Sequence, residues 1–143
     1  MVVVEGRGIP IGVLVTSAQQ AEVRLAPATL ATVGVPQARG RPKTRPRQLV
    51  ADRGYDSRPF RRSLRRRGIR PCIPPRAFQG RRRPGRPLQT FRKEYARRWI
   101  VERTFAWLGN FRRLVVRYER LVHVYYGLFL LACVLICLAR ILE

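Results

Sequence analysis

Residues 48–73 read QLVADRGYDSRPFRRSLRRRGIRPCI, and this stretch decides the fold class. The compact apolar run that opens it predicts a buried strand ending at Asp52, because turn-forming residues follow. Ser57 is a typical helix N-cap, and Gly68 can end the helix that Ser57 begins. A second short strand is predicted over 69–73. A strand, a helix and a strand in succession indicate an α/β fold.

The residues on either side continue this alternation. Residues 1–16 read as two short strands joined by glycines, which predicts a β-hairpin, and 18–32 suits a short helix. Strong helical patterning over 91–108 predicts a further helix, and 121–142 forms a final apolar helix. The order strand, strand, helix, strand, helix, strand, helix, helix implies a mixed α/β layer structure.

The composition points to a polyanionic partner. The chain has 143 residues, which suits one domain over 1–143, and it carries 30 Lys+Arg against 8 Asp+Glu, a formal charge of +22. A compact domain with that charge repels itself unless a polyanion neutralises it, so nucleic acid is the expected partner. Nearly all the basic residues are arginine, whose guanidinium suits bidentate contact with phosphate.

The arginines gather in runs, and one run lies in a stretch without an apolar pattern. Residues 74–88 are rich in proline, glycine and arginine, which predicts a flexible basic loop that cannot bury enough apolar surface to pack. The runs are Arg61–Arg62, Arg65–Arg67, Arg81–Arg83 and Arg112–Arg113.

The cysteines and the N-terminal residues indicate a reducing compartment. Cys72, Cys133 and Cys137 form no CxxC pair, and Cys133 and Cys137 share a helix face among apolar neighbours, so both are expected in the core. The opening MVVVEGRG lacks the basic and long apolar regions of a signal peptide. We therefore expect the protein in the cytoplasm.

Two acidic positions could take part in metal chemistry. Asp52 lies at a strand end, where chemistry is common. In the helix predicted over 91–108, Tyr95, Arg98 and Glu102 project from one face, within about 60° of each other. By itself, an arginine four residues before a glutamate is more often a helix salt bridge. The aromatic residues of this helix, Trp99 and Trp107, are expected in the core before any role in base stacking.

Together these segments resemble a known family. LVADRGYDS (residues 49–57) and YARRWIVERTFAWLGNFRRL (95–114) closely resemble the DDE transposases of bacterial insertion sequences, whose RNase H-like domain carries one Asp at a strand end and a Glu on a late helix. The family's Tyr-x2-Arg-x3-Glu signature corresponds to Tyr95, Arg98 and Glu102, and the resemblance covers essentially the whole chain.

The resemblance implies a magnesium enzyme acting on DNA. Asp52 and Glu102 would be catalytic metal ligands for Mg²⁺ or Mn²⁺, since hard cations need several oxygen ligands. The expected partners are the insertion-sequence ends and target DNA of the bacterial nucleoid. The residues expected to contact DNA are Tyr95, Arg98, Arg81, Arg82, Arg83, Arg112 and Arg113.

The sequence departs from the family pattern at three points. The family's first catalytic Asp lies upstream of the opening hairpin, before Met1, so the resemblance implies an RNase H-like mixed sheet truncated at its N-terminal strand, with weak metal binding. The basic residue seven positions after the family's Glu falls on Gly109, so Arg112 or Arg113 would replace it. Glu22 stands where the family usually has Asp, and we interpret it as a surface or capping residue.

Three interpretations follow from these features. The chain is a fragment of a transposase, or the second frame of a frameshifted element whose upstream frame supplies the first Asp. Alternatively, it is a catalytically dead remnant that only binds DNA through its basic surface. A single membrane span over 121–139 is the least favoured, because the resembling family ends in an apolar helix packed on its sheet, and we expect no stable membrane association.

Overall fold

The computed structural model describes residues 1–17, 19–76 and 92–142. In chain order its elements are β1 (Val2–Val4), β2 (Pro10–Val13), α1 (Glu22–Ala31), β3 (Gln48–Val50), the 3-10 helix η1 (Arg53–Tyr55), α2 (Arg58–Arg66), β4 (Arg70–Cys72), α3 (Arg92–Tyr95), the 3-10 helix η2 (Ala96–Arg98), α4 (Trp99–Gly109), α5 (Arg112–Val115) and α6 (Val122–Leu142). The predicted order of strands and helices is confirmed, and α5 is an addition. The fold class is therefore α/β, as predicted.

The strands of the described segments form two separate two-stranded sheets. β1 and β2 make the predicted antiparallel hairpin, whose turn contains Gly8 at a φ of 91°. β3 and β4 pair in parallel and are joined through α2. A single RNase H-like mixed sheet is thus not present in these segments, and that part of the fold stays a prediction.

β3 is not the buried strand that the apolar pattern predicted. Gln48 is exposed, while Leu49 and Val50 are only half-buried. The reason is that β3 has one neighbouring strand, β4, so its other edge is not covered by a strand of the described part of the chain.

The helix between β3 and β4 forms as its local sequence dictates. The Ser57 hydroxyl accepts a hydrogen bond from the Phe60 N–H at 3.2 Å, which satisfies one of the free donors of the first turn. Phe60 and Leu64 are buried one turn apart, and Gly68 ends the segment at a φ of 69°. Both helix boundaries predicted from the sequence are confirmed.

The helix predicted over 91–108 is divided into three parts. The 3-10 helix η2 separates α3 from α4, and the buried face of α4 consists of Ile100, Thr104 and Leu108. Trp99 is 52% exposed, so its prediction as a core residue was wrong. Instead, its ring packs on the guanidinium of Arg103, 4.8 Å from the ring centroid.

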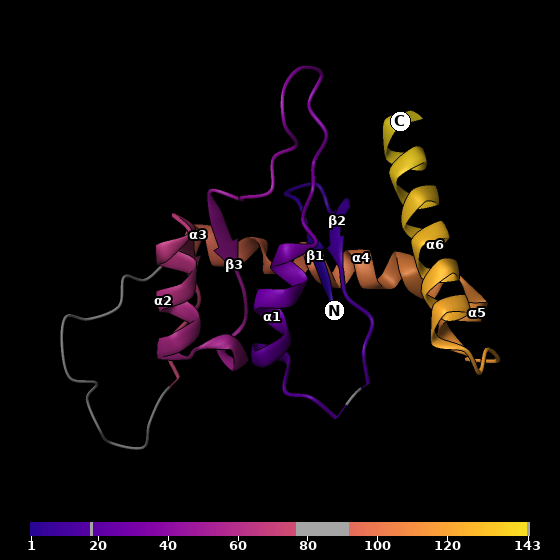
Figure 1. Cartoon of the computed structure of the whole chain (residues 1–143), viewed down its shortest axis with the longest axis horizontal. Coiled ribbons are helices and arrows are strands. Elements are labelled where there is room, and N and C mark those ends of the chain that lie inside the picture. Colours follow the sequence, from indigo (N-terminus) through magenta and orange to yellow (C-terminus); the bar gives the residue numbers. More distant parts are fainter. Residues whose placement is uncertain (18, 77–91, 143) are drawn as a thin grey trace.

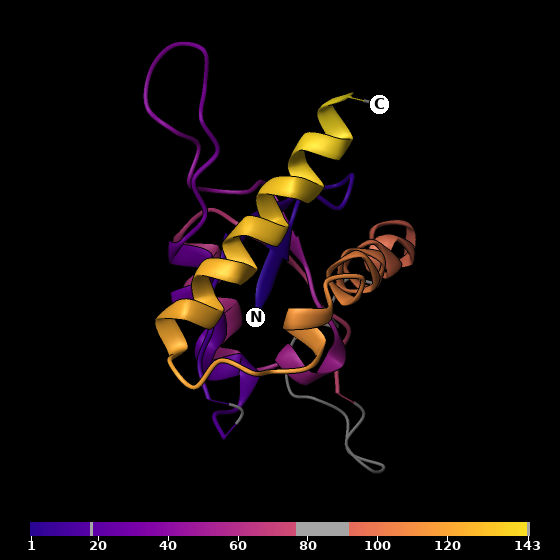
Figure 2. The ribbon, with the colours of Figure 1, turned by 90° about the vertical axis from the view of Figure 1, so that its right-hand side faces the viewer.

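The final helix α6 is present as predicted but is not buried. Figure 1 shows it at the opposite end of the molecule from α2, and Figure 2 shows it crossing the hairpin side of the molecule. Only Ala132, Cys133 and Ile136 are buried, in a small core with Val13 and Leu108. By length and composition α6 could cross a membrane, although these two properties alone are weak evidence for a membrane span. Of its most apolar 18-residue stretch, 17% is buried. The expectation of a buried helix was therefore wrong for most of α6.

A second core lies on the other side of the hairpin. It joins α1 and α2 through Ala26, Leu30, Phe60 and Leu64, and it includes Ile69 and Ile73 at the ends of the β4 segment. Half-buried side chains of β1 and β3 pack against the same core. This core is what brings the tip of β3, with Asp52, close to the hairpin and α1.

Candidate active site

The predicted acidic residues line one cavity of about 580 Å³. Its walls come from the first residues of the hairpin, from α1, from β3 up to Asp52, and from η2 and α4 with Arg98 and Glu102. Asp52 and Glu102 therefore belong to the same concave surface although they are far apart in the sequence. Folding brings the strand tip and the late helix together.

Asp52 is held by the turn that follows it. It is the N-cap of η1, and its Oδ1 accepts a hydrogen bond from the Gly54 N–H at 2.7 Å. A Cβ on Gly54 would lie 2.9 Å from the same oxygen, so the glycine leaves room for the carboxylate. The residue is exposed.

Glu102 forms an ion pair on its own helix face. The Arg98 Nη2 lies 2.6 Å from the Glu102 Oε1, and the side chains are 38% and 56% exposed. The salt bridge considered from the sequence is therefore present. It engages one carboxylate oxygen, Oε1, of a side chain that is more than half exposed. Tyr95 is half-buried at the end of α3, and along the chain the 3-10 helix η2 separates it from α4, which carries Glu102.

Glu22 contributes to the cavity more than the sequence suggested. It lies in the first turn of α1, where a carboxylate favours the helix dipole, and its Oε2 accepts a hydrogen bond from the Tyr55 hydroxyl at 2.7 Å. Burial, together with Glu22, raises the pKa of the Tyr55 phenol, so this hydroxyl stays protonated and donating. The bond joins α1 to the turn after Asp52.

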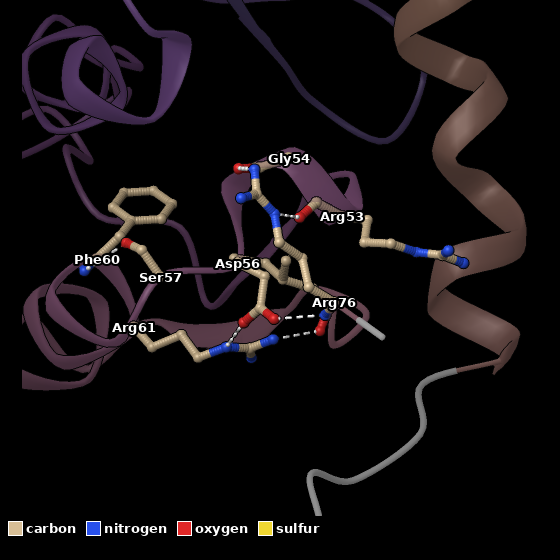
Figure 3. Close-up of polar contacts among 8 residues, drawn as sticks. Arg53, Gly54, Asp56, Ser57, Phe60, Arg61 and Arg76 are labelled. Atoms are coloured by element: carbon tan, nitrogen blue, oxygen red, sulfur yellow. Dashed lines mark hydrogen bonds and ion pairs between the residues drawn. The ribbon is translucent and has the colours of Figure 1, made fainter. Parts of the chain in front are cut away.

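The structurally important acid that sequence reasoning missed is Asp56 (Figure 3). It is buried, and its Oδ1 accepts from the Arg61 Nε at 2.8 Å while its Oδ2 accepts from the Arg76 backbone N–H at 2.6 Å. Arg61 also donates to the Ile73 carbonyl at 2.6 Å. The sequence signal for this buried ion pair was an aspartate directly before the Ser57 N-cap, followed by an arginine in the first turns of the helix. Arg61 therefore ties the β3–α2 turn to the segment after β4. Because it is buried there, Arg61 does not belong to the exposed arginines that could contact DNA.

The remaining residues expected at the DNA surface are not gathered at the cavity. Arg112 is exposed on α5, and Arg113 pairs with Glu119 at 3.0 Å. Arg81, Arg82 and Arg83 lie outside the described residues, as does most of the loop predicted over 74–88. Of the predicted DNA contacts, Arg98 alone is a cavity-lining residue among those that the structure describes.

The described part of the chain does not contain a complete metal site. Within it, no group of three or more His, Cys, Asp or Glu side chains is placed to hold an ion. Asp52 and Glu102 offer two carboxylates on one cavity, the donor type that Mg²⁺ prefers, and an ion held by them alone would take its other ligands from water or substrate phosphate.

The fold and the cavity define a strongly basic α/β domain with a carboxylate at a strand end and another on a late helix. Residues 1–137 match the family described as Transposase DDE domain, and the chain belongs to this family. The predicted resemblance to bacterial insertion-sequence DDE transposases is thereby confirmed.

One relative supports the same assignment. The chain is 41% identical over 137 residues to a Burkholderia cepacia protein attributed to insertion sequence element IS402 as its transposase. The match covers 95% of this chain, and the chain spans about 60% of the length of that relative. No solved structure matches the chain.

Proposed function

We propose that this chain supplies part of the catalytic domain of a transposase that cleaves and joins DNA at the ends of an insertion sequence. The observation that carries the proposal is that Asp52 and Glu102 line one cavity, in a domain of the transposase family with a formal charge of +22. A phosphate-binding surface alone gains nothing from two carboxylates, which repel DNA unless a cation lies between them.

The residues fit part of a site for Mg²⁺ or Mn²⁺. Asp52 and Glu102 would hold the ion, each with one carboxylate oxygen already oriented, by Gly54 and by Arg98 respectively. A bound divalent ion lowers the pKa of an attacking water or 3′-hydroxyl and stabilises the leaving oxygen of a phosphodiester. With two carboxylates, affinity for the ion would be weak until a further ligand joins them.

The chain's own residues would bind and orient the DNA. Exposed arginines neutralise phosphates, and Arg98 keeps Glu102 in place at the cavity wall. Because the polyanion is chromosomal, the place of action would be the bacterial cytoplasm at the nucleoid. The family match covers residues 1–137 of this chain and so includes most of α6. This supports the interpretation of α6 as part of a soluble domain and not as a membrane span.

The first catalytic Asp of the family would come from polypeptide upstream of the hairpin. The coverage of the relative, about 60%, supports a longer protein, made as one chain or through a frameshift between two reading frames. The competing proposal is a remnant that binds DNA without cleaving it. It rests on the described segments, in which no set of three or more His, Cys, Asp or Glu side chains is placed to hold a metal ion.

The deciding experiment fuses the upstream segment of the element to this chain and measures cleavage of its own ends with Mg²⁺. We expect Asp52→Asn and Glu102→Gln each to lower cleavage by about a hundredfold or more without weakening DNA binding, because each removes a ligand charge. Glu94→Gln is the matched control, since Glu94 lines the same cavity and pairs with an arginine as Glu102 does, Arg70 at 3.4 Å, but is not one of the two expected metal ligands.

The outcomes separate the two proposals. Cleavage that survives Asp52→Asn would contradict the role of Asp52 as a metal ligand. A fused protein that binds the ends but never cleaves them would establish the competing proposal, in which the chain is a remnant that only binds DNA.

A further inference from the structure

A basic arm, residues 35–47, projects from the domain between α1 and β3. In Figures 1 and 2 the segment between these two elements stands clear of the other elements, and residues 38–45 are all exposed. The arm contains five arginine or lysine side chains and no acid, so it has no carboxylate of its own to neutralise them and attracts a polyanion. Its cations are Arg39, Arg41, Lys43, Arg45 and Arg47.

The base of the basic arm is held by hydrogen bonds. Val35 and Lys43 exchange both backbone hydrogen bonds, at 2.9 and 2.8 Å, in an antiparallel bridge. The Gln37 Nε2 donates to the Pro36 carbonyl at 2.8 Å. Pro36 and Pro42 restrict the backbone further, because the proline ring fixes φ. An arm with a preorganised backbone loses less conformational entropy when it binds a partner.

The tip of the basic arm has no side chain at its centre. Gly40 has a φ of 88°, a region in which side chains are strained, and a Cβ there would meet nothing within 4 Å. The backbone conformation, and not crowding within the protein, therefore requires a glycine. Without a Cβ the backbone of the tip can approach a ligand closely. Arg39 and Arg41 flank the glycine, so two guanidinium groups accompany this close approach.

These features fit the minor groove of DNA better than the major groove. The major groove is about 12 Å wide, accommodates a helix or a two-stranded ribbon, and is read by side chains that reach base edges. The minor groove is about 6 Å wide, and where A·T pairs narrow it further its negative potential attracts arginine. So narrow a space suits a single segment of chain with a glycine at its centre. Guanidinium also enters it more readily than ammonium, because it is more weakly hydrated.

We propose that the basic arm inserts residues 39–41 into the minor groove of duplex DNA at A·T-rich sites. Gly40 lies against the floor of the groove, and Arg39 and Arg41 occupy the groove on either side of it. Guanine places an N2 amino group on that floor, which an A·T pair lacks. G·C pairs therefore keep the backbone of the tip away from the floor, and the arm prefers A·T pairs.

The position of the basic arm links this contact to the cavity. Pro46 and Arg47, at the base of the arm, line the cavity, and β3 leads from there to Asp52. A duplex held by the arm is thus placed beside the two carboxylates, with a sequence preference that phosphate contacts do not provide. The inference takes DNA as the partner from the proposed function, but groove recognition needs neither metal nor cleavage. It is therefore tested in EDTA.

Four duplexes that differ only in their central base pairs distinguish the two grooves. Replacing guanine by inosine removes the N2 amino group and leaves the major-groove edge unchanged, whereas 2,6-diaminopurine in place of adenine adds an amino group to the minor groove. The full chain is titrated against each labelled duplex at one salt concentration, and fluorescence anisotropy gives the dissociation constants. We expect the A·T and inosine·C duplexes to bind about tenfold more tightly than the G·C and diaminopurine·T duplexes.

Charge-matched variants test whether the preference comes from the basic arm. Arg39→Ala with Arg41→Ala removes two exposed charges at the tip, and Arg62→Ala with Arg66→Ala removes two on α2. Because both changes lower the net charge equally, their general effect on attraction to DNA is matched. The tenfold ratio of dissociation constants should fall to about one in the arm variant and persist in the α2 variant. Circular dichroism spectra verify that each variant is folded.

A matched pair of glycine variants tests the shape of the tip. Gly40→Ala should reduce the ratio at least about threefold, because the added Cβ strains the backbone and widens the part of the chain that enters the groove. Gly34→Ala, next to the arm, should leave the ratio unchanged. A Cβ at Gly34 would meet nothing within 4 Å, and Gly34 is not among the glycines with positive φ.

The pattern across the four duplexes decides the proposal. Tight binding of the A·T and diaminopurine·T duplexes together, or of the G·C and inosine·C duplexes together, would indicate reading in the major groove and would overturn it. Equal binding of all four, or a preference that persists without Arg39 and Arg41, would overturn it as well. A fused transposase that cleaves its ends without this preference would refute only this inference. A chain that shows the preference but never cleaves DNA when fused would refute only the proposed function.

Discussion

At the scale of single residues, Asp56 and Arg61 form the ion pair on which the β3–α2 turn depends. Both side chains are almost fully buried, at 0% and 6% exposed. Replacing a buried pair with apolar residues can be neutral, but removing one partner leaves a buried charge without compensation. Asp56→Ala should therefore lower the free energy of unfolding by about 3–5 kcal/mol, as measured by urea denaturation.

A surface pair provides the control for this prediction. The Arg7 Nε lies 3.6 Å from the Glu5 Oε1, and the Arg7 side chain is 79% exposed. Arg7→Ala should change stability by about 0.5 kcal/mol or less, since exposed pairs are screened by solvent. Equal losses in the two variants would show that burial does not distinguish the pairs.

Cys133 gives a second prediction at this scale, which concerns pH. Burial, with a smaller contribution from Cys137, raises the pKa of its thiol from 9.0 to about 11. A shift of two pKa units lowers the thiolate fraction about a hundredfold at neutral pH, so alkylation by iodoacetamide should be slower than in the urea-unfolded chain by at least that factor. Peptide mapping by mass spectrometry measures this for each cysteine separately.

The same shift affects stability in a defined pH window. The unfolded thiol ionises near 9.0 and the folded one near 11, so the neutral folded form is favoured below 9.0 and this stabilisation is lost as the pH rises toward 11. Cys133→Ala removes that part of the pH dependence. An unchanged decline between pH 9 and 11 in this variant would assign the decline to other groups.

At the scale of elements, the hairpin turn is tied to α4 through Gly8. The Thr104 hydroxyl donates to the Gly8 carbonyl at 2.7 Å, and a Cβ at Gly8 would lie 3.0 Å from the Thr104 oxygen. Gly8 also has a φ of 91°, where side chains are strained. We expect Gly8→Ala to destabilise the chain by about 1–3 kcal/mol, as measured by thermal and urea unfolding.

Gly6 in the same turn is the matched control. A Cβ there would meet nothing within 4 Å, and Gly6 is not among the glycines with positive φ. Gly6→Ala should be neutral or slightly stabilising, because it reduces the entropy of the unfolded chain. If both variants lose equal stability, close packing of the turn on α4 is not the reason for a glycine at position 8.

At the scale of the whole molecule, the exposed arginines of α2 and the acidic cavity are separate features. Arg58, Arg62 and Arg66 are exposed along one side of α2 and line a shallow depression there, while Asp52 and Glu102 line the cavity between the sheets. Phosphate contacts and carboxylate chemistry should therefore respond independently to mutation.

Salt dependence of duplex binding tests this separation. Each neutralised phosphate adds about −0.9 to the slope of log K against log salt. If Arg62 and Arg66 contact phosphates, Arg62→Ala with Arg66→Ala should flatten the slope by about 1.8, whereas Asp52→Asn should leave it unchanged. A slope unaffected by the arginine pair would place the DNA contacts elsewhere, with Arg81, Arg82 and Arg83 as the next variants to test.

The sequence by itself determined the elements and the family of this protein. Ser57, Gly68 and the alternating apolar runs act over a few residues, so the hairpin, α1, α2 and β4 form close to their predicted places. The family signature is likewise a local pattern, which Tyr95, Arg98 and Glu102 display within one short stretch of the chain.

Only the tertiary structure decided which residues are covered and which carboxylates line one cavity. The patterns for Trp99 and α6 indicated apolar surface but not whether a neighbour covers it, and both are largely exposed. Asp56 and Asp52 look alike in ADRGYDS, yet one is buried against Arg61 and the other lines the cavity with Glu102. Burial and long-range contact depend on how whole elements pack, and no local stretch of sequence contains that information.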